Sequence, residues 1–219
     1  GRDVTDVGGH DLLQALSDMD YVTQQGLSGA IYALLAFDCR GYGIAADKNA
    51  VQTSREGLVK YILDKQLKDG GWAYSGDKAE PDMTAMALQA LAAYYKTDAK
   101  VKDAVDKAVT CLSKLQNTTG GYDSYGSVNS ESAAQVITAL TALGIDPDND
   151  ARFVKNGVSV LDSLCGFYVD GGFRHVSDGK LDPTATAQGY YALAAYYRFA
   201  DSQTALYDMT DLNTVEKAA

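Results

Sequence analysis

The chain has 219 residues, enough for one domain, and its 46% hydrophobic residues can bury a sizeable core, which excludes general disorder. Its 29 acidic and 19 basic residues leave a net charge of −10, which argues against a nucleic-acid or anionic-membrane surface. No apolar run approaches the roughly 18 residues that a membrane-spanning helix needs, so we expect no membrane span.

The N-terminal stretch, residues 9–51, predicts a degenerate helix pair. A short helix is expected over Asp11–Tyr21, and an apolar helix over Ser28–Cys39. The second helix aligns with a later alanine-rich segment, Ala87–Ala93. We therefore interpret this stretch as the first member of a series of repeats.

From residue 52 onward the chain repeats itself, in segments 52–99, 100–145 and 146–200. Each segment carries a Gly-Gly-aromatic triplet, and successive triplets stand 50 and 51 residues apart. The triplets are Gly70-Gly71-Trp72, Gly120-Gly121-Tyr122 and Gly171-Gly172-Phe173. Because each pair turns the chain after a helix, we predict a positive φ for at least one glycine of each pair.

Each triplet separates two kinds of predicted helix. The helix before it has apolar residues on one side only, which is typical of an outer helix, whereas the helix after it is rich in Ala, Leu and Tyr on most sides and should be buried. The buried helices are predicted at Asp82–Tyr95, Glu131–Leu143 and Thr184–Tyr197. The sequence thus predicts an all-α fold of about four helix pairs in inner and outer layers. The tail, 201–219, is expected to add a short helix around Thr204–Leu212.

The repeat unit resembles that of the prenyltransferase and squalene-cyclase family. The resemblance lies in the triplet, in the loop of about ten residues that follows it, and in the run Thr84-Ala85-Met86-Ala87-Leu88. The resemblance covers 52–197, and Gln66–Trp72 is similar to the glutamine–tryptophan motif of the cyclases. It implies an α/α toroid, here incomplete, formed by a single domain, 1–219. The same toroid is similar to the α-domain of cobalamin carriers and to repeat domains of bacterial surface proteins. An extracellular or cell-surface location is implied by this resemblance.

The family's two chemistries can be compared with these residues. Prenyltransferases hold zinc with Asp, Cys and His, but no Cys stands near Asp82 or Asp182, and His175 precedes its helix, so we expect no metal and no cofactor. Cyclases protonate an alkene with an Asp-x-Asp-Asp motif, of which Glu80 and Asp82 keep the first and third acids while Met83 replaces the last. These two carboxylates are the candidate catalytic acids.

The alternative role for Glu80 and Asp82 is to cap a helix N-terminus. Asn129 and Asp182 stand at the place of Glu80 in the other repeats, which favours capping. About four helix pairs also leave the predicted ring open, whereas a carbocation reaction needs a closed, dry cavity. The sequence therefore leans away from an enzyme.

The leading hypothesis is a non-catalytic module of a secreted or cell-surface protein that binds an unknown ligand or a neighbouring domain. Loops 74–81, 123–130 and 174–183 should converge where the inner helices begin, and loops on a rigid scaffold commonly carry binding residues. The predicted binding residues are Tyr74, Asp82, Tyr125, His175 and Asp182. Helix N-termini suit an anionic or hydroxylated ligand. Two alternatives remain: an isoprenoid cyclase or prenyltransferase with Asp82 as acid, and a purely structural repeat.

Cys111 and Cys165 lie on successive predicted outer helices. A disulfide between them is open on geometry, but buried free thiols are the favoured interpretation.

Overall fold

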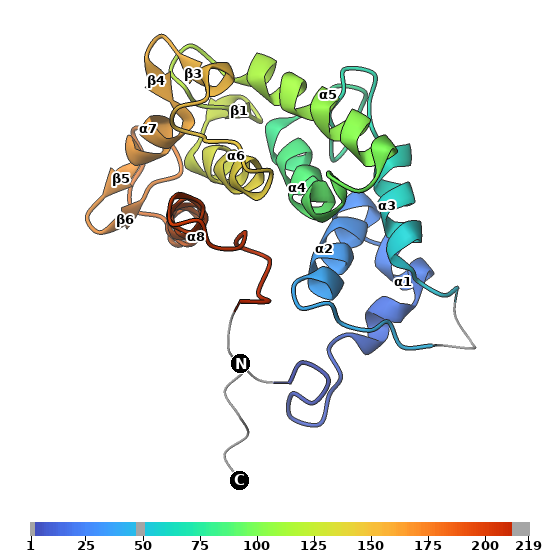
Figure 1. Cartoon of the computed structure of the whole chain (residues 1–219). Helices are drawn as coiled ribbons and strands as arrows, with labels where there is room; N and C mark the ends of the chain where they lie inside the picture. Colours follow the sequence, from blue (N-terminus) through green and yellow to red (C-terminus); the bar gives the residue numbers. More distant parts are fainter. Residues whose placement is uncertain (1–2, 47–50, 212–219) are drawn as a thin grey trace. The chain divides into compact units, whose positions relative to one another are not determined.

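The computed structural model describes residues 3–46 and 51–211 (Figure 1), and the chain divides into two compact units. One unit comprises Gly1–Lys65 and Tyr207–Ala219, and the other comprises Gln66–Leu206. Residues 47–50 of the predicted first repeat and 212–219 of the tail, including Leu212, lie outside the described residues. No helix within 3–46 and 51–211 is long and apolar enough to cross a membrane.

The first unit is helical. It contains a 3-10 helix, Gln14–Ser17, and the helices α1 (Met19–Thr23), α2 (Gly26–Asp38) and α3 (Arg55–Asp64). Helix α2 packs against α1 and α3. Gly29 permits the close approach of α1, because a Cβ there would lie 2.0 Å from the Val22 carbonyl oxygen.

The second unit is built around a row of three helices, α4 (Pro81–Leu91), α6 (Ser130–Ala142) and α8 (Pro183–Ala200). Helix α6 packs against both α4 and α8. Helix α5 (Ala99–Leu115) packs on α4, and α7 (Val160–Cys165) packs on α6 (Figure 1). Helices α4 and α6 are buried on most sides, as their alanine-rich sequences predict.

The three residues of each Gly-Gly-aromatic triplet have separate functions in the fold. The first glycine has a positive φ, as predicted: 93° at Gly70, 77° at Gly120 and 83° at Gly171. The second has no room for a side chain; a Cβ at Gly71, for example, would lie 2.5 Å from the Cβ of Ala79. The aromatic is almost completely buried in all three triplets, at Trp72, Tyr122 and Phe173.

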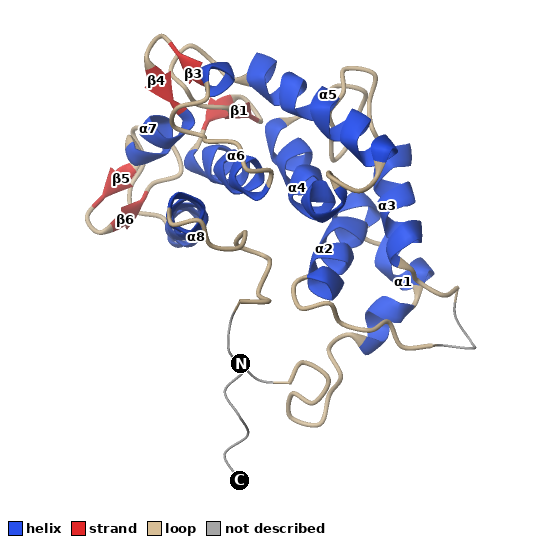
Figure 2. Cartoon of the chain, in the orientation of Figure 1, coloured by secondary structure: helices blue, strands red, loops and turns tan. Residues whose placement is uncertain are grey.

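The predicted all-α toroid is wrong as a fold class, because the described residues also form three two-stranded antiparallel sheets (Figure 2). Their strands are β1 (Asp123–Ser124) with β2 (Ser127–Val128), β3 (Val154–Lys155) with β4 (Val158–Ser159), and β5 (Tyr168–Val169) with β6 (Gly172–Phe173). Each pair is closed by a two-residue turn in which both residues have a positive φ. Such turns match the twist of paired strands, so they favour a hairpin over a loop or a helix.

The helix bounds differ from the predictions mainly where a hairpin or a 3-10 helix intervenes. The bounds of the predicted buried helices agree with α2, α4, α6 and α8 to within a few residues, and the segment after α4 continues as a 3-10 helix, Ala92–Tyr94. The predicted burial on most sides is wrong for α8, which is buried on one side only. The outer helix expected before the third triplet begins only at Val160, because Asn156-Gly157 forms the β3–β4 turn. Residues 204–211 form no helix, so that prediction is wrong for the described part of the tail.

Candidate functional site

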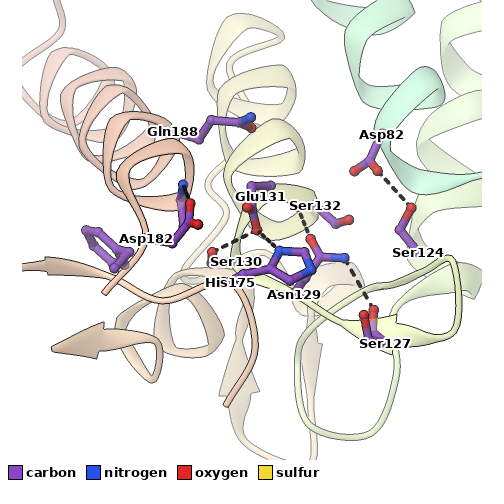
Figure 3. Close-up of polar contacts among 12 residues, drawn as sticks. Asp82, Ser124, Ser127, Asn129, Ser130, Glu131, Ser132, His175, Asp182 and Gln188 are labelled. Atoms are coloured by element: carbon purple, nitrogen blue, oxygen red, sulfur yellow. Dashed lines mark hydrogen bonds and ion pairs between the residues drawn. The ribbon is translucent and has the colours of Figure 1, made fainter. Parts of the chain in front are cut away.

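The N-terminal ends of α4, α6 and α8 gather polar side chains with the loops that precede these helices (Figure 3). Tyr74 and Tyr125, both predicted to bind, are strongly exposed, at 71% and 87%. Asp82 and Asp182 are only partly exposed. The predicted residues therefore include two aromatic rings in solvent and two carboxylates held closer to the protein.

Tyr74, Glu80, Asp82 and Tyr125 form what we call the acidic–aromatic cluster. The charge of Glu80 is the main cause that raises the pKa of Tyr125 above its ordinary value, followed by burial, by Asp82 and by Tyr74. The Tyr74 backbone N–H donates to Oε1 of Glu80 at 2.6 Å. Two carboxylates thus lie close enough to influence an exposed tyrosine.

Tyr125 has an uncommon backbone conformation. Its φ is 54°, in the left-handed region, and the corresponding residues of the other two hairpins are Asn156 and Asp170, with φ of 52° and 49°. Asn and Asp adopt this region much more readily than an aromatic residue does. A tyrosine at this position is therefore unfavourable for the hairpin itself.

Asp82 does not cap α4. Its Oδ2 accepts a hydrogen bond from the Ser124 hydroxyl at 2.8 Å, while its Oδ1 is buried and has no hydrogen-bond partner within the described residues. The Ser132 hydroxyl is also buried without a partner in that part of the chain, and it projects from α6 on the side of Asp82 (Figure 3). Buried polar atoms normally have partners, so these two atoms mark a place where a polar ligand or water can bind.

Glu131 and His175 form a second polar contact. Nδ1 of His175 lies 2.8 Å from Oε2 of Glu131, which also accepts from the Ser130 hydroxyl at 3.0 Å. The Ser130 backbone N–H donates to the His175 carbonyl oxygen at 3.0 Å. These bonds join the start of α6 to the loop between β6 and α8 (Figure 3).

The two contacts are the same contact made in successive repeats. Asp82 and Glu131 each stand two residues after the residue that precedes their helix, and Ser124 and His175 each stand four residues after the first glycine of a triplet. In both repeats, a carboxylate near the start of a helix accepts a hydrogen bond from a side chain in the loop of the next repeat. Sequence reasoning missed Ser124 and Glu131, although these offsets could have identified them.

Side-chain capping occurs at the starts of α6 and α8 but not at the start of α4. The Asn129 side chain accepts from the Ser132 N–H at 2.9 Å, and the Asp182 side chain accepts from the Ala185 N–H at 2.8 Å. Glu80 makes no side-chain cap bond. The predicted binding residue Asp182 is thus the N-cap of α8, and the carboxylates at these helix starts disfavour the predicted anionic ligand.

A row of glutamines crosses the three helices farther from this end. Nε2 of Gln89 on α4 donates to Oε1 of Gln135 on α6 at 2.9 Å. Nε2 of Gln135 in turn donates to the Tyr191 hydroxyl at 2.6 Å and to Oε1 of Gln188 at 3.2 Å, both on α8. Side-chain amides thus fix the register of the row.

The remaining candidate features lie elsewhere. Within 3–46 and 51–211, no group of three or more His, Cys, Asp or Glu side chains is arranged to hold a metal ion. Cys111 and Cys165 are free thiols; Cys111 is buried as predicted, but Cys165 is exposed because it ends the short helix α7. A hollow of about 610 Å³ in the first unit is lined by Leu16, Tyr21 and Tyr32 among others, and by none of the predicted site residues.

No protein-family model matches this chain, and no curated protein matches it either.

Proposed function

We propose that this chain is a non-catalytic binding module that takes up an ammonium or guanidinium group of a partner at the acidic–aromatic cluster. The module would belong to a secreted or cell-surface protein. The resemblance of its repeats to those of the prenyltransferase and squalene-cyclase family stays a prediction about its origin.

The observation that carries the proposal is the backbone of Tyr125. A left-handed conformation costs a non-glycine residue about 1–2 kcal/mol. The exposed ring recovers little of this through burial, since 87% of the residue is accessible. Strain of this kind is typical of functional positions, where a side chain has to be presented in one direction.

The surroundings of Tyr125 favour a cation. The face of a tyrosine ring attracts ammonium and guanidinium groups, and the charges of Glu80 and Asp82 lie close enough to raise its pKa. The buried Oδ1 of Asp82 is an acceptor without a partner among the described residues, and a cationic N–H group can donate to it. The chain's net charge of −10 also accelerates the approach of a basic partner.

The two alternatives make different demands. An alkene-protonating Asp82 would have to be a neutral acid against an apolar cavity, whereas its Oδ2 accepts from Ser124 in a contact that Glu131 and His175 repeat. Turnover of a polyprenyl substrate by the chain, lost in Asp82→Asn, would favour the enzyme. A purely structural repeat would bind no cation at the cluster.

The proposal can be tested by calorimetric titration with an oligolysine and an oligoarginine peptide, with an oligoglutamate peptide of equal length as the negative probe. Tyr125→Asn should weaken binding by about threefold to tenfold, because it removes a cation–π contact. The same variant should unfold at a higher temperature, because Asn adopts the left-handed region more easily.

A matched control separates specific from diffuse attraction. Glu80→Gln should weaken binding and reduce its salt dependence, whereas Asp103→Asn, which removes an exposed carboxylate of α5, should have little effect. Equal losses in these two variants, or unchanged binding by Tyr125→Asn, would contradict the proposal.

A further inference from the structure

Helix α8 ends the row of three helices, and one of its faces carries exposed side chains. The residues buried on the other side are small: Ala185, Gly189, Ala192 and Ala195. The exposed face carries Ala187, Tyr190, Ala194 and Tyr197, which we call the α8 seam. Their spacing of three, four and three residues is that of a helix-pairing stripe. By contrast, α6 has α4 and α8 as neighbours.

The α8 seam is apolar in a strongly acidic protein. No charged residue occurs from Pro183 to Tyr197, although the chain carries a net charge of −10. Exposed Tyr168 extends the patch, since its ring packs edge-on against Phe173, which packs edge-on against Tyr190. An uncharged aromatic patch of this kind marks an interaction surface, and like-charge repulsion is smallest there.

We propose that the α8 seam pairs with the same seam of a second copy of this chain, in an antiparallel two-fold dimer. Centred at residue 192, this pairing places Ala187 opposite the partner's Tyr197 and Tyr190 opposite the partner's Ala194. Each large side chain therefore faces a small one, which is how helix interfaces fill space. The interface is the same patch on both subunits, so the assembly closes at two copies.

The order of residues along the seam selects this arrangement over a parallel one. A parallel pair in register would place tyrosine against tyrosine and alanine against alanine, which alternates crowding with gaps. The antiparallel pair has neither defect. Tyr190 is also oriented before association, because its hydroxyl donates to the Gly171 carbonyl oxygen at 2.8 Å.

The test is the mass of the full chain in solution, measured by analytical ultracentrifugation over a wide range of concentrations. The unmodified chain should form a dimer. Ala187→Tyr places two tyrosines together and should raise the dissociation constant about tenfold or more. Tyr197→Ala removes the matching ring and should also weaken the dimer.

The double variant Ala187→Tyr with Tyr197→Ala exchanges the two sizes and should recover most of the lost affinity, because each pair again joins a large and a small residue. The control is Ala99→Tyr, at an exposed alanine that begins α5, which should leave the dimer unchanged. Thermal unfolding of each variant verifies that the monomer is folded.

Three results would overturn the proposal. In the first, the unmodified chain stays monomeric at its highest soluble concentration. In the second, Ala187→Tyr leaves the dissociation constant of the dimer unchanged. In the third, the double variant loses as much affinity as the two single variants combined. None of these measurements depends on cation binding at the acidic–aromatic cluster, so the two proposals stand or fall separately.

Discussion

Gly120 and Gly144 allow the two functions of a glycine to be measured separately. Both have a positive φ, 77° and 75°. A Cβ at Gly120 would lie 2.7 Å from the Ser159 carbonyl oxygen and 2.9 Å from that of Val158, whereas a Cβ at Gly144 would meet nothing within 4 Å. Replacing each by alanine therefore imposes the same conformational penalty but very different crowding.

The expected losses of stability follow from these contacts. The left-handed conformation should cost about 1–2 kcal/mol of unfolding free energy in both variants. Gly120→Ala adds a clash with backbone atoms, which cannot rotate away as a side chain can, and overpacking of this kind costs about a further 1–3 kcal/mol. We expect about 1–2 kcal/mol for Gly144→Ala and about 2–5 kcal/mol for Gly120→Ala.

Urea denaturation followed by tryptophan fluorescence measures this difference. Trp72 is the only tryptophan of the chain, is fully buried, and lies in the same compact unit as both glycines. If Gly144→Ala lost as much stability as Gly120→Ala, the positive φ alone would account for both effects, and the close approach between the triplet and β4 would be irrelevant.

Four further predictions concern three side chains. Burial, with a smaller effect of Asp69, raises the pKa of the Cys111 thiol to about 11. At pH 9, where an ordinary thiol is half ionised, iodoacetamide should therefore modify Cys111 much more slowly than exposed Cys165. Mass spectrometry measures the two rates. Because this folded-state pKa lies above the unfolded one, the contribution of Cys111 to stability is present below pH 9 and is lost as the pH rises through 11, a loss that Cys111→Ala should diminish in urea titrations. Gln135→Leu removes amide bonds across the three-helix row and should lower the unfolding free energy by about 1 kcal/mol in the same titration. Glu131→Gln should cost less than about 1 kcal/mol, since His175 is half exposed, and a larger loss would show that this contact is a main support of the row.

The elements that depend on short-range chemistry could be predicted from the sequence. The glycine triplets identified three chain reversals, and the positive φ of Gly70, Gly120 and Gly171 followed because other residues are strained there. The alanine-rich segments identified α4 and α6, because a helix without a polar side has to be buried.

The hairpins could be predicted only in part. Asn156-Gly157 and Asp170-Gly171 are typical of tight hairpin turns, but the one-sided apolar pattern before the third triplet favoured an outer helix instead. Tyr125-Gly126 carries no such signal, because tyrosine rarely adopts a positive φ. In the folded chain, the positive φ of Tyr125 occurs together with the pairing of Asp123 and Val128 across the β1–β2 hairpin.

The candidate site divides in the same way. The sequence by itself determined which loops carry Tyr74, Tyr125 and His175 and at which end of the helices they lie, since helix periodicity and repeat spacing are properties of the chain. Only the tertiary structure decided that Asp82 bonds Ser124 instead of capping α4, and that Tyr190 and Tyr197 of α8 stay exposed. Hydrogen-bond partners and exposed faces depend on which helices pack together, and local sequence preferences do not specify that packing.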